Sequence, residues 1–108
     1  MEINLTTKGS NAIISLKGEL DFNTCREFEE ILEQAIEKAD PIIVVDLTSV
    51  EHIDSMGLGC LTRLWKHAAD KKTDLHIAGA NKNVSGLINL VNLDKRMKMF
   101  SKVDEALS

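Results

Sequence analysis

The sequence lacks a long apolar run, an excess of basic residues and a cluster of cysteines, and each absence argues against a class of protein. The longest uninterrupted apolar run covers residues 42–45, far short of the ~20 residues that span a membrane. The 13 basic residues are spread along a chain of net charge −4, so no basic patch indicates nucleic-acid binding. Cys25 and Cys60 have no Cys-x-x-Cys spacing, and we expect both to be reduced thiols in the core or near the surface of a cytoplasmic protein.

Signals for export and for several domains are missing as well. The first residues carry neither the basic nor the apolar segment of a secretory signal peptide. The chain has no repeat, no low-complexity stretch and no linker. Its 108 residues, 44% of them hydrophobic, suit one domain with one core. We therefore expect a single soluble domain over residues 1–108 in the cytoplasm, as a monomer or weak dimer.

The motifs of common catalytic and cofactor sites are also absent. There is no G-x-x-x-x-G-K-[S/T] phosphate loop, no G-x-G-x-x-G after the first strand and no G-x-S-x-G elbow. His52, His67 and His76 lack metal-ligand spacing, and His76 alternates within a strand, where it should be half-exposed. His52, Asp54 and Ser55 are sequence neighbours, whereas a catalytic triad is built from separate elements. We expect no enzyme, no cofactor and no metal site.

The apolar pattern at the start of the chain predicts a β-hairpin followed by a helix. Residues 3–5 alternate apolar and polar side chains, residues 12–16 form a second short apolar segment, and the turn-forming residues 8–11 lie between them. Apolar side chains at helical spacing follow at Cys25, Phe28, Ile31, Leu32, Ala35 and Ile36.

Polar residues mark both ends of this helix. Asn23 or Thr24 can cap its start, and Glu27 follows Thr24 at capping-box distance. Asp40 and Pro41 should end the helix, because a residue before proline is disfavoured in helical conformation.

Three further strands alternate with helices in the rest of the chain. Residues 42–47 are apolar apart from Asp46, which is typical of a strand covered on both faces. The next helical stripe comprises Leu58, Leu61, Leu64, Trp65 and Ala68, which should pack on the sheet. A strand at residues 75–78, a helix over 84–91, a short edge strand at 97–100 and a helix from residue 101 complete the pattern. The order β-β-α-β-α-β-α-β-α predicts an α/β fold with a mixed sheet, mostly parallel with an N-terminal hairpin, packed with about four helices.

The most informative segment is residues 54–59, Asp-Ser-Met-Gly-Leu-Gly, where the link at residues 48–53 leads into a helix. A serine there lies among free backbone N–H groups at the positive end of the helix dipole, which suits a phosphate. Gly57 and Gly59 would let another molecule's backbone approach closely. Alternatively, Ser55 is an N-cap and the glycines only shape a turn.

Basic side chains lie opposite the apolar stripe of the same helix. They are Arg63, Lys66, His67 and Lys71. Such a face is usually only solvated, and the functional alternative is a partner-binding face beside Ser55.

Three segments together resemble a STAS domain of the anti-sigma factor antagonist family. Residues 18–21, Gly-Glu-Leu-Asp, resemble the family's motif at the end of the second strand, and residues 43–50 resemble its central strand and following loop. Residues 53–59 resemble the D-S-x-G-L-G phosphorylation motif. The resemblance covers nearly the whole chain, with the same element order.

The resemblance implies that Ser55 is phosphorylated by a partner anti-sigma kinase using ATP. Asp54 would flank it, Asp21 would lie near it on the same rim, and Met56, in place of a small residue, would tune the choice of partner. With Arg63 from the basic face, the expected partner-binding residues are Asp21, Asp54, Ser55, Met56, Gly57, Leu58, Gly59 and Arg63.

The function implied by the resemblance is a regulatory switch. The unphosphorylated form would bind an anti-sigma factor serine kinase and so release a sigma factor, and a PP2C-type phosphatase would act on the phosphorylated form. No direct contact with nucleic acid or membrane is expected. The alternative is a STAS subunit of another complex, such as a stress-signalling scaffold or a lipid-transport ATPase. An enzyme or nucleotide-binding domain is disfavoured, because no phosphate loop, metal set or nucleophile–base pair accompanies Ser55.

Overall fold

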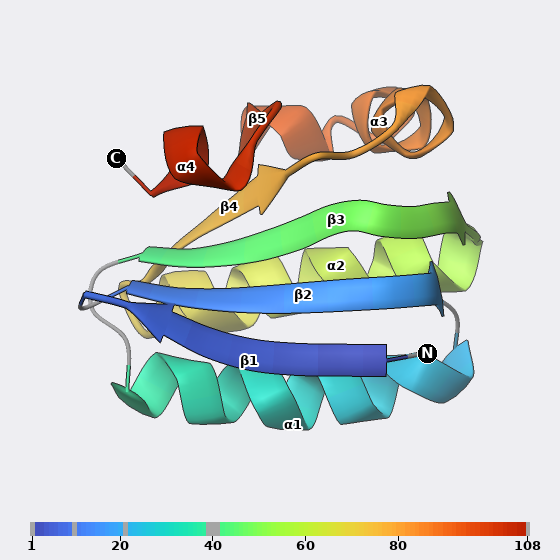
Figure 1. Ribbon diagram of the computed structural model, residues 1–108. Helices are drawn as coiled ribbons and strands as arrows, with labels where there is room; N and C mark the ends of the chain where they lie inside the picture. Colours follow the sequence, from blue (N-terminus) through green and yellow to red (C-terminus); the bar gives the residue numbers. More distant parts are fainter. Residues whose placement is uncertain (1, 10, 21, 39–41, 108) are drawn as a thin grey trace.

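The computed structural model describes residues 2–9, 11–20, 22–38 and 42–107, which form one mixed sheet with helices packed against it (Figure 1). The strands lie in chain order from β1 to β5; β1 is antiparallel to β2, and the other neighbouring strands are parallel. The elements are β1 (Glu2–Lys8), β2 (Asn11–Leu20), α1 (Phe22–Lys38), β3 (Ile42–Ile53), α2 (Ser55–Asp70), β4 (Asp74–Ala78), α3 (Lys82–Leu90), the 3₁₀ helix η1 (Leu93–Lys95), β5 (Lys98–Phe100) and α4 (Val103–Ala106). This arrangement confirms the predicted α/β class, the N-terminal hairpin and the mostly parallel sheet.

Helices cover both faces of the sheet. α1 and α2 lie side by side on one face (Figure 1), and α4 packs on the other. Ile43 and Val45 of β3 belong to the main core cluster with α1 and α2, whereas Val44 belongs to a second cluster that includes Ala106 of α4. None of these three β3 side chains is exposed, which confirms a strand covered on both faces. No helix in the described ranges is long and apolar enough to cross a membrane.

β3 is longer than predicted. Residues 48–53, expected to form a link, continue the strand and pair with the end of β2, where Glu19 lies opposite His52 and Leu20 opposite Ile53. Buried positions in this half of β3 recur every third residue, because the register with β2 shifts twice. A strand normally alternates every second residue, so the sequence pattern did not indicate it. The longer strand brings the ends of β2 and β3 to the start of α2.

The expected caps of α1 are wrong. α1 begins before Asn23 and Thr24, which lie inside its first turn, whereas an N-cap must precede the helix. The Thr24 hydroxyl instead donates to the carbonyl of Glu19 at 3.4 Å. Asp21, expected at the partner interface, and the expected helix end at residues 40–41 lie outside the described residues.

Two aromatic side chains, His76 of β4 and Trp65 of α2, differ in how deeply they are buried. His76, predicted to be half-exposed, is only 5% exposed, because α4 covers it and its Nδ1 donates to the carbonyl of Ala106 at 2.7 Å. Its ring lies 5.1 Å from that of Phe100. Trp65 packs against the core as predicted but is only partly buried, and the guanidinium carbon of Arg96 lies 5.0 Å from its ring centroid.

Candidate functional site at the start of α2

Asp54 is the single residue between β3 and α2, and it caps the helix. Its backbone is extended, with φ −99° and ψ −177°, and its Oδ1 accepts a hydrogen bond from the amide of Gly57 at 2.7 Å. Its carbonyl accepts from the amide of Leu58 at 2.9 Å. These are the bonds of an N-cap residue. The alternative that Ser55 is the cap is therefore wrong, since the neighbouring aspartate fills that role.

Ser55 is the first residue of α2, and its side chain is exposed. Among the described residues, none makes a hydrogen bond to its hydroxyl. The backbone N–H groups of a first helical turn point outward at this end and give it positive electrostatic potential. Ser55 thus combines an accessible hydroxyl with an environment that stabilises negative charge.

The two glycines of the turn have different roles. Gly57 is buried, and a Cβ added to it would lie against the carbonyl oxygen of Leu20 and 2.7 Å from Cγ1 of Ile53. Gly59 is exposed, with no atom within 4 Å of an added Cβ. Gly57 therefore seats α2 on the ends of β2 and β3, which is not the partner approach expected from the sequence. Gly59 leaves an open place on the helix surface.

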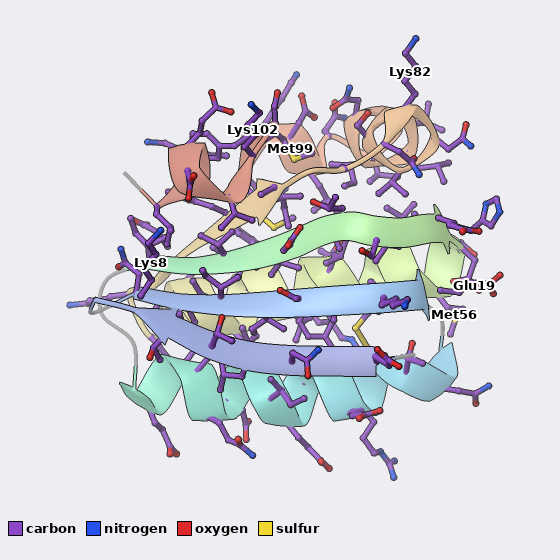
Figure 2. The ribbon with its side chains drawn as sticks, in the orientation of Figure 1. Lys8, Glu19, Met56, Lys82, Met99 and Lys102 are labelled. Carbon is purple, nitrogen blue, oxygen red and sulfur yellow. A yellow bond between two sulfur atoms is a disulfide. The ribbon has the colours of Figure 1, made fainter. Side chains whose placement is uncertain are left out.

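The remaining turn residues divide in the same way between interior and surface. Leu58 is 8% exposed and belongs to the core. Met56 is a large apolar side chain that is 52% exposed, and it lies at the same end of the molecule as Glu19 (Figure 2). The surface of this turn is thus made by Asp54, Ser55, Met56 and Gly59.

An acidic rim borders Asp54. Glu19 and Asp54, with His52, Leu20 and Ile53, line a small cavity of about 90 Å³ at the ends of β2 and β3. Glu19 was not among the predicted site residues. The sequence could have placed it here, because Glu19 lies at the end of the predicted second strand and the carboxyl ends of neighbouring parallel strands meet at one edge of a sheet.

Arg63 points to α1 and not to the Ser55 turn. Its Nη2 lies 3.1 Å from Oε1 of Glu29 and donates to Sγ of Cys25 at 3.0 Å. One helical turn further on, Nε2 of His67 lies 3.6 Å from Oε1 of Glu33. Half of the predicted basic face is therefore paired with carboxylates of α1.

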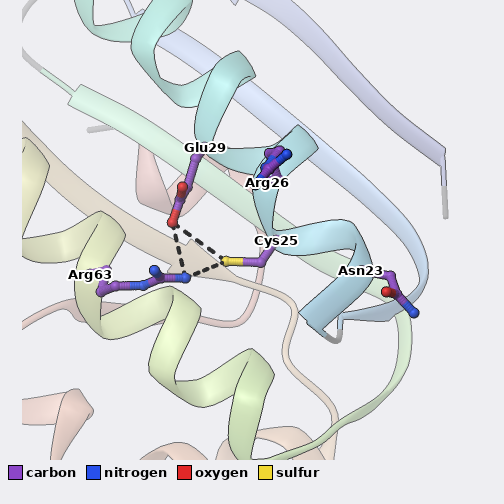
Figure 3. Close-up of a pocket in the computed structure, with 5 residues that line it drawn as sticks. All are labelled: Asn23, Cys25, Arg26, Glu29 and Arg63. Carbon is purple, nitrogen blue, oxygen red and sulfur yellow. Dashed lines mark hydrogen bonds and ion pairs between the residues drawn. The ribbon is translucent and has the colours of Figure 1, made fainter.

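Cys25 and Cys60 form a disulfide between α1 and α2, so the prediction of two reduced thiols is wrong. Their Cα atoms lie 5.9 Å apart although 35 residues separate them in the sequence; no local pattern indicates this, because it depends on how the helices pack. A cavity of about 380 Å³ beside the bridge is lined by Asn23, Cys25, Arg26, Glu29 and Arg63 (Figure 3).

The same place holds a group with the chemistry of metal ligands. The sulfur atoms of Cys25 and Cys60 and a carboxylate oxygen of Glu29 lie within 4.8 Å of one another. Zinc would need the cysteines as thiolates, and with the sulfurs bonded to each other that donor set does not exist.

Comparison with known proteins places the chain in a family. A model of the STAS domain matches residues 2–106. The chain belongs to the STAS domain family. This STAS domain is 29% identical over 97 residues to the anti-sigma-B factor antagonist of Staphylococcus aureus, a match that covers 90% of each chain.

Solved structures agree with the fold. The STAS domain superimposes on an anti-sigma factor antagonist from Mycobacterium paratuberculosis with a TM-score of 0.86 and 23% identity, over 98% of this chain and 90% of that one. It also matches the Bacillus anti-sigma factor antagonist SpoIIAA, in its unphosphorylated form with a TM-score of 0.81 and 19% identity (98% and 93% covered) and in its phosphorylated form with 0.75 and 18% (98% and 96% covered).

Proposed function

We propose that this STAS domain is an anti-sigma factor antagonist that is switched by phosphorylation of Ser55. The unphosphorylated form binds an anti-sigma factor that is also a serine kinase, and transfer of the ATP γ-phosphate to Ser55 ends the binding. The observation that carries the proposal is the exposed, unbonded Ser55 hydroxyl as the first residue of α2. The names of the S. aureus relative and of the two SpoIIAA forms support it.

The free domain can accept the phosphate without unfolding. Ser55 is exposed, so the added group stays in water, and it lies at the positive end of the α2 dipole. Asp54 already satisfies the Gly57 amide, so the cap does not depend on the serine. Phosphorylation should therefore change the surface and leave the core in place.

Phosphorylation should weaken binding to a partner, although it leaves the fold intact. A phosphate adds about −1.5 to −2 charges at pH 7, beside Asp54 and the acidic rim that contains Glu19. A partner covering Ser55 and Met56 would have to remove water from this concentration of negative charge, which is costly without dedicated cations. The same surface without the phosphate offers an exposed methionine and a small hydroxyl, which are readily buried.

The proposed contact surface follows one side of α2. Ser55, Gly59 and Arg63 are four residues apart and share a helical face, with Met56 beside them. Gly59 allows the partner's backbone to come close, since nothing of this chain fills the space. Gly57 and Leu58 support the turn from inside. Arg63, held by Glu29, lies at the far border, about 12 Å along the helix axis from Ser55.

The experiment combines phosphate transfer with binding. Each anti-sigma kinase encoded in the source genome is purified and incubated with ATP and the domain, and intact mass gives the number of phosphates. We expect one phosphate on the wild type and on Ser49→Ala, a control that removes another exposed hydroxyl, and none on Ser55→Ala. A PP2C-type phosphatase should remove the phosphate.

The binding arm uses titrations with the kinase that transferred phosphate. Wild type and Ser49→Ala should bind equally, and Ser55→Asp should bind more weakly. Phosphate remaining on Ser55→Ala, or undiminished binding by Ser55→Asp, would contradict the proposal.

A further inference from the structure

The disulfide joins α1 and α2 close to the Ser55 turn. Its two sulfur atoms have different surroundings, because Cys25 lines a cavity and Cys60 does not. We propose that Cys25 and Cys60 are a reversible redox modification site, in which a peroxide oxidises Cys25 and Cys60 then closes the bridge. The inference rests on the cavity, the burial of the two sulfurs and the charges around them, and it does not depend on the proposed partner.

Access from solvent favours Cys25 as the sulfur that reacts first. Cys25 lines the 380 Å³ cavity at the first turn of α1, together with four polar or charged residues (Figure 3). Cys60 has no exposed surface and does not line the cavity. A small oxidant entering the cavity therefore meets Cys25, while Cys60 lies behind it.

The charges around the cavity favour the same sulfur. Nη2 of Arg63 lies 3.0 Å from Sγ of Cys25, and Arg26 also lines the cavity. Glu29 holds the guanidinium at 3.1 Å, with its Oε1 3.6 Å from the sulfur. Two arginines against one carboxylate leave a net positive surrounding. In the reduced protein this stabilises the Cys25 thiolate, the form of cysteine that reacts with oxidants.

The proposed chemistry has two steps and uses hydrogen peroxide as the oxidant. The Cys25 thiolate attacks one peroxide oxygen, the O–O bond breaks, and the departing hydroxide takes up a proton to leave as water, giving a sulfenic acid on Cys25. The Cys60 sulfur then attacks Sγ of Cys25, the S–O bond breaks, and the thiol proton leaves with the hydroxide as a second water. In sum, two thiols and one peroxide give one disulfide and two waters, and a dithiol reductant reverses the oxidation by exchange.

The bond has a local mechanical effect. Cys60 follows Ser55 by five residues, in the second turn of α2, and the bridge fixes this part of the helix to the first turn of α1. Two polar side-chain contacts also link the helices among the described residues, Arg63–Glu29 and His67–Glu33; both are partly solvent-exposed, and such contacts contribute little. Oxidation therefore adds a covalent restraint near the start of α2 to its core packing, and reduction removes that restraint.

The test starts from protein reduced with dithiothreitol and desalted, to which one equivalent of hydrogen peroxide is added. We expect wild type to lose both free thiols, to stay a single chain on a non-reducing gel, and to regain both thiols in dithiothreitol without denaturant. In Cys60→Ala, dimedone, which traps sulfenic acids, should label Cys25. In Cys25→Ala, Cys60 should remain a free thiol. Alanine is used because these sites are buried, and circular dichroism checks that each variant is folded.

A matched pair of variants tests the role of the guanidinium. Arg63→Gln should slow oxidation about tenfold, because the thiolate loses its nearest cation. His67→Gln changes the neighbouring contact with Glu33 of α1 and leaves the surroundings of the sulfurs as they are, so its oxidation rate should equal that of wild type. Preferential labelling of Cys60, an unchanged rate in Arg63→Gln, or a bridge that dithiothreitol opens only in the denatured protein would overturn the proposal.

Discussion

Replacing Gly57 with alanine should destabilise the domain, because the space beside its Cα is already filled. The added Cβ would lie against the carbonyl oxygen of Leu20 and 2.7 Å from Cγ1 of Ile53. The carbonyl belongs to β2, which cannot move without disturbing its pairing with β3. Overpacking of this kind lowers the free energy of unfolding by about 1–3 kcal/mol. The higher helix propensity of alanine than of glycine offsets at most ~1 kcal/mol of this loss. We expect a net loss of about 1–2 kcal/mol in the free energy of unfolding.

Gly59 provides the matched control two residues further along the same helix. An alanine Cβ there meets no atom within 4 Å, so the substitution should stabilise the domain by about 0.5–1 kcal/mol. The two variants carry the same chemical change in one helix. They should therefore differ by about 1.5–3 kcal/mol, with opposite signs relative to wild type.

Urea unfolding followed by circular dichroism measures this difference directly, with the slope m checked to be equal in all three proteins. Thermal melts provide a second measurement, since 1 kcal/mol moves the melting temperature of a domain of this size by about 4 °C. If Gly57→Ala proves as stable as Gly59→Ala, the close contact of α2 with the end of β2 is wrong. Both glycines would then serve the open face, as the sequence alone suggested.

Four further substitutions test the surface and the core of α2. Ser55→Asp should leave the melting temperature unchanged or slightly raised, because an anion at a helix start is favourable by about 0.3–1 kcal/mol; a large drop would contradict the position of Ser55. Trp65→Ala should reduce the free energy of unfolding in urea by about 2 kcal/mol, less than the 3–5 kcal/mol of a fully buried tryptophan, because the ring is only partly buried. Arg63→Glu should lower stability by up to about 1 kcal/mol by turning the pair with Glu29 into a repulsion, whereas Lys66→Glu on the same exposed side should have no measurable effect on the melting curve.

Features that depend on local pattern were predicted well. The mostly apolar residues 42–47 indicated a strand buried on both faces, and the alternation of strands and helices indicated the parallel sheet. The start of α2 was found because a short polar segment separates two apolar patterns. The capping residue of α2 was not predicted, because Asp54 and Ser55 are both good caps. Only the fold shows that Asp54 is the residue that precedes the helix.

Features that depend on packing between distant segments were missed. The bond between Cys25 and Cys60 requires α1 and α2 to lie side by side, and the burial of His76 requires the short helix α4 to cover it. The inward role of Gly57 depends on the carbonyl of Leu20. In each case the deciding atom belongs to a residue 30 or more positions away, beyond any sequence window.

The order of strands in the sheet has a consequence for how the chain acquires its structure. Each strand after β1 pairs with the strand before it in the chain, so the sheet can grow in chain order. The β1–β2 hairpin can close first, on a timescale of about 1–10 μs, and each later strand with its helix can add to a finished edge. The parallel pairs form across an intervening helix, with partners such as Ala12 and Ile43 or Ile42 and Asp74 far apart in the sequence, so we expect them to form more slowly than the hairpin. During synthesis, β3 can dock on the hairpin before β4 and β5 have been made.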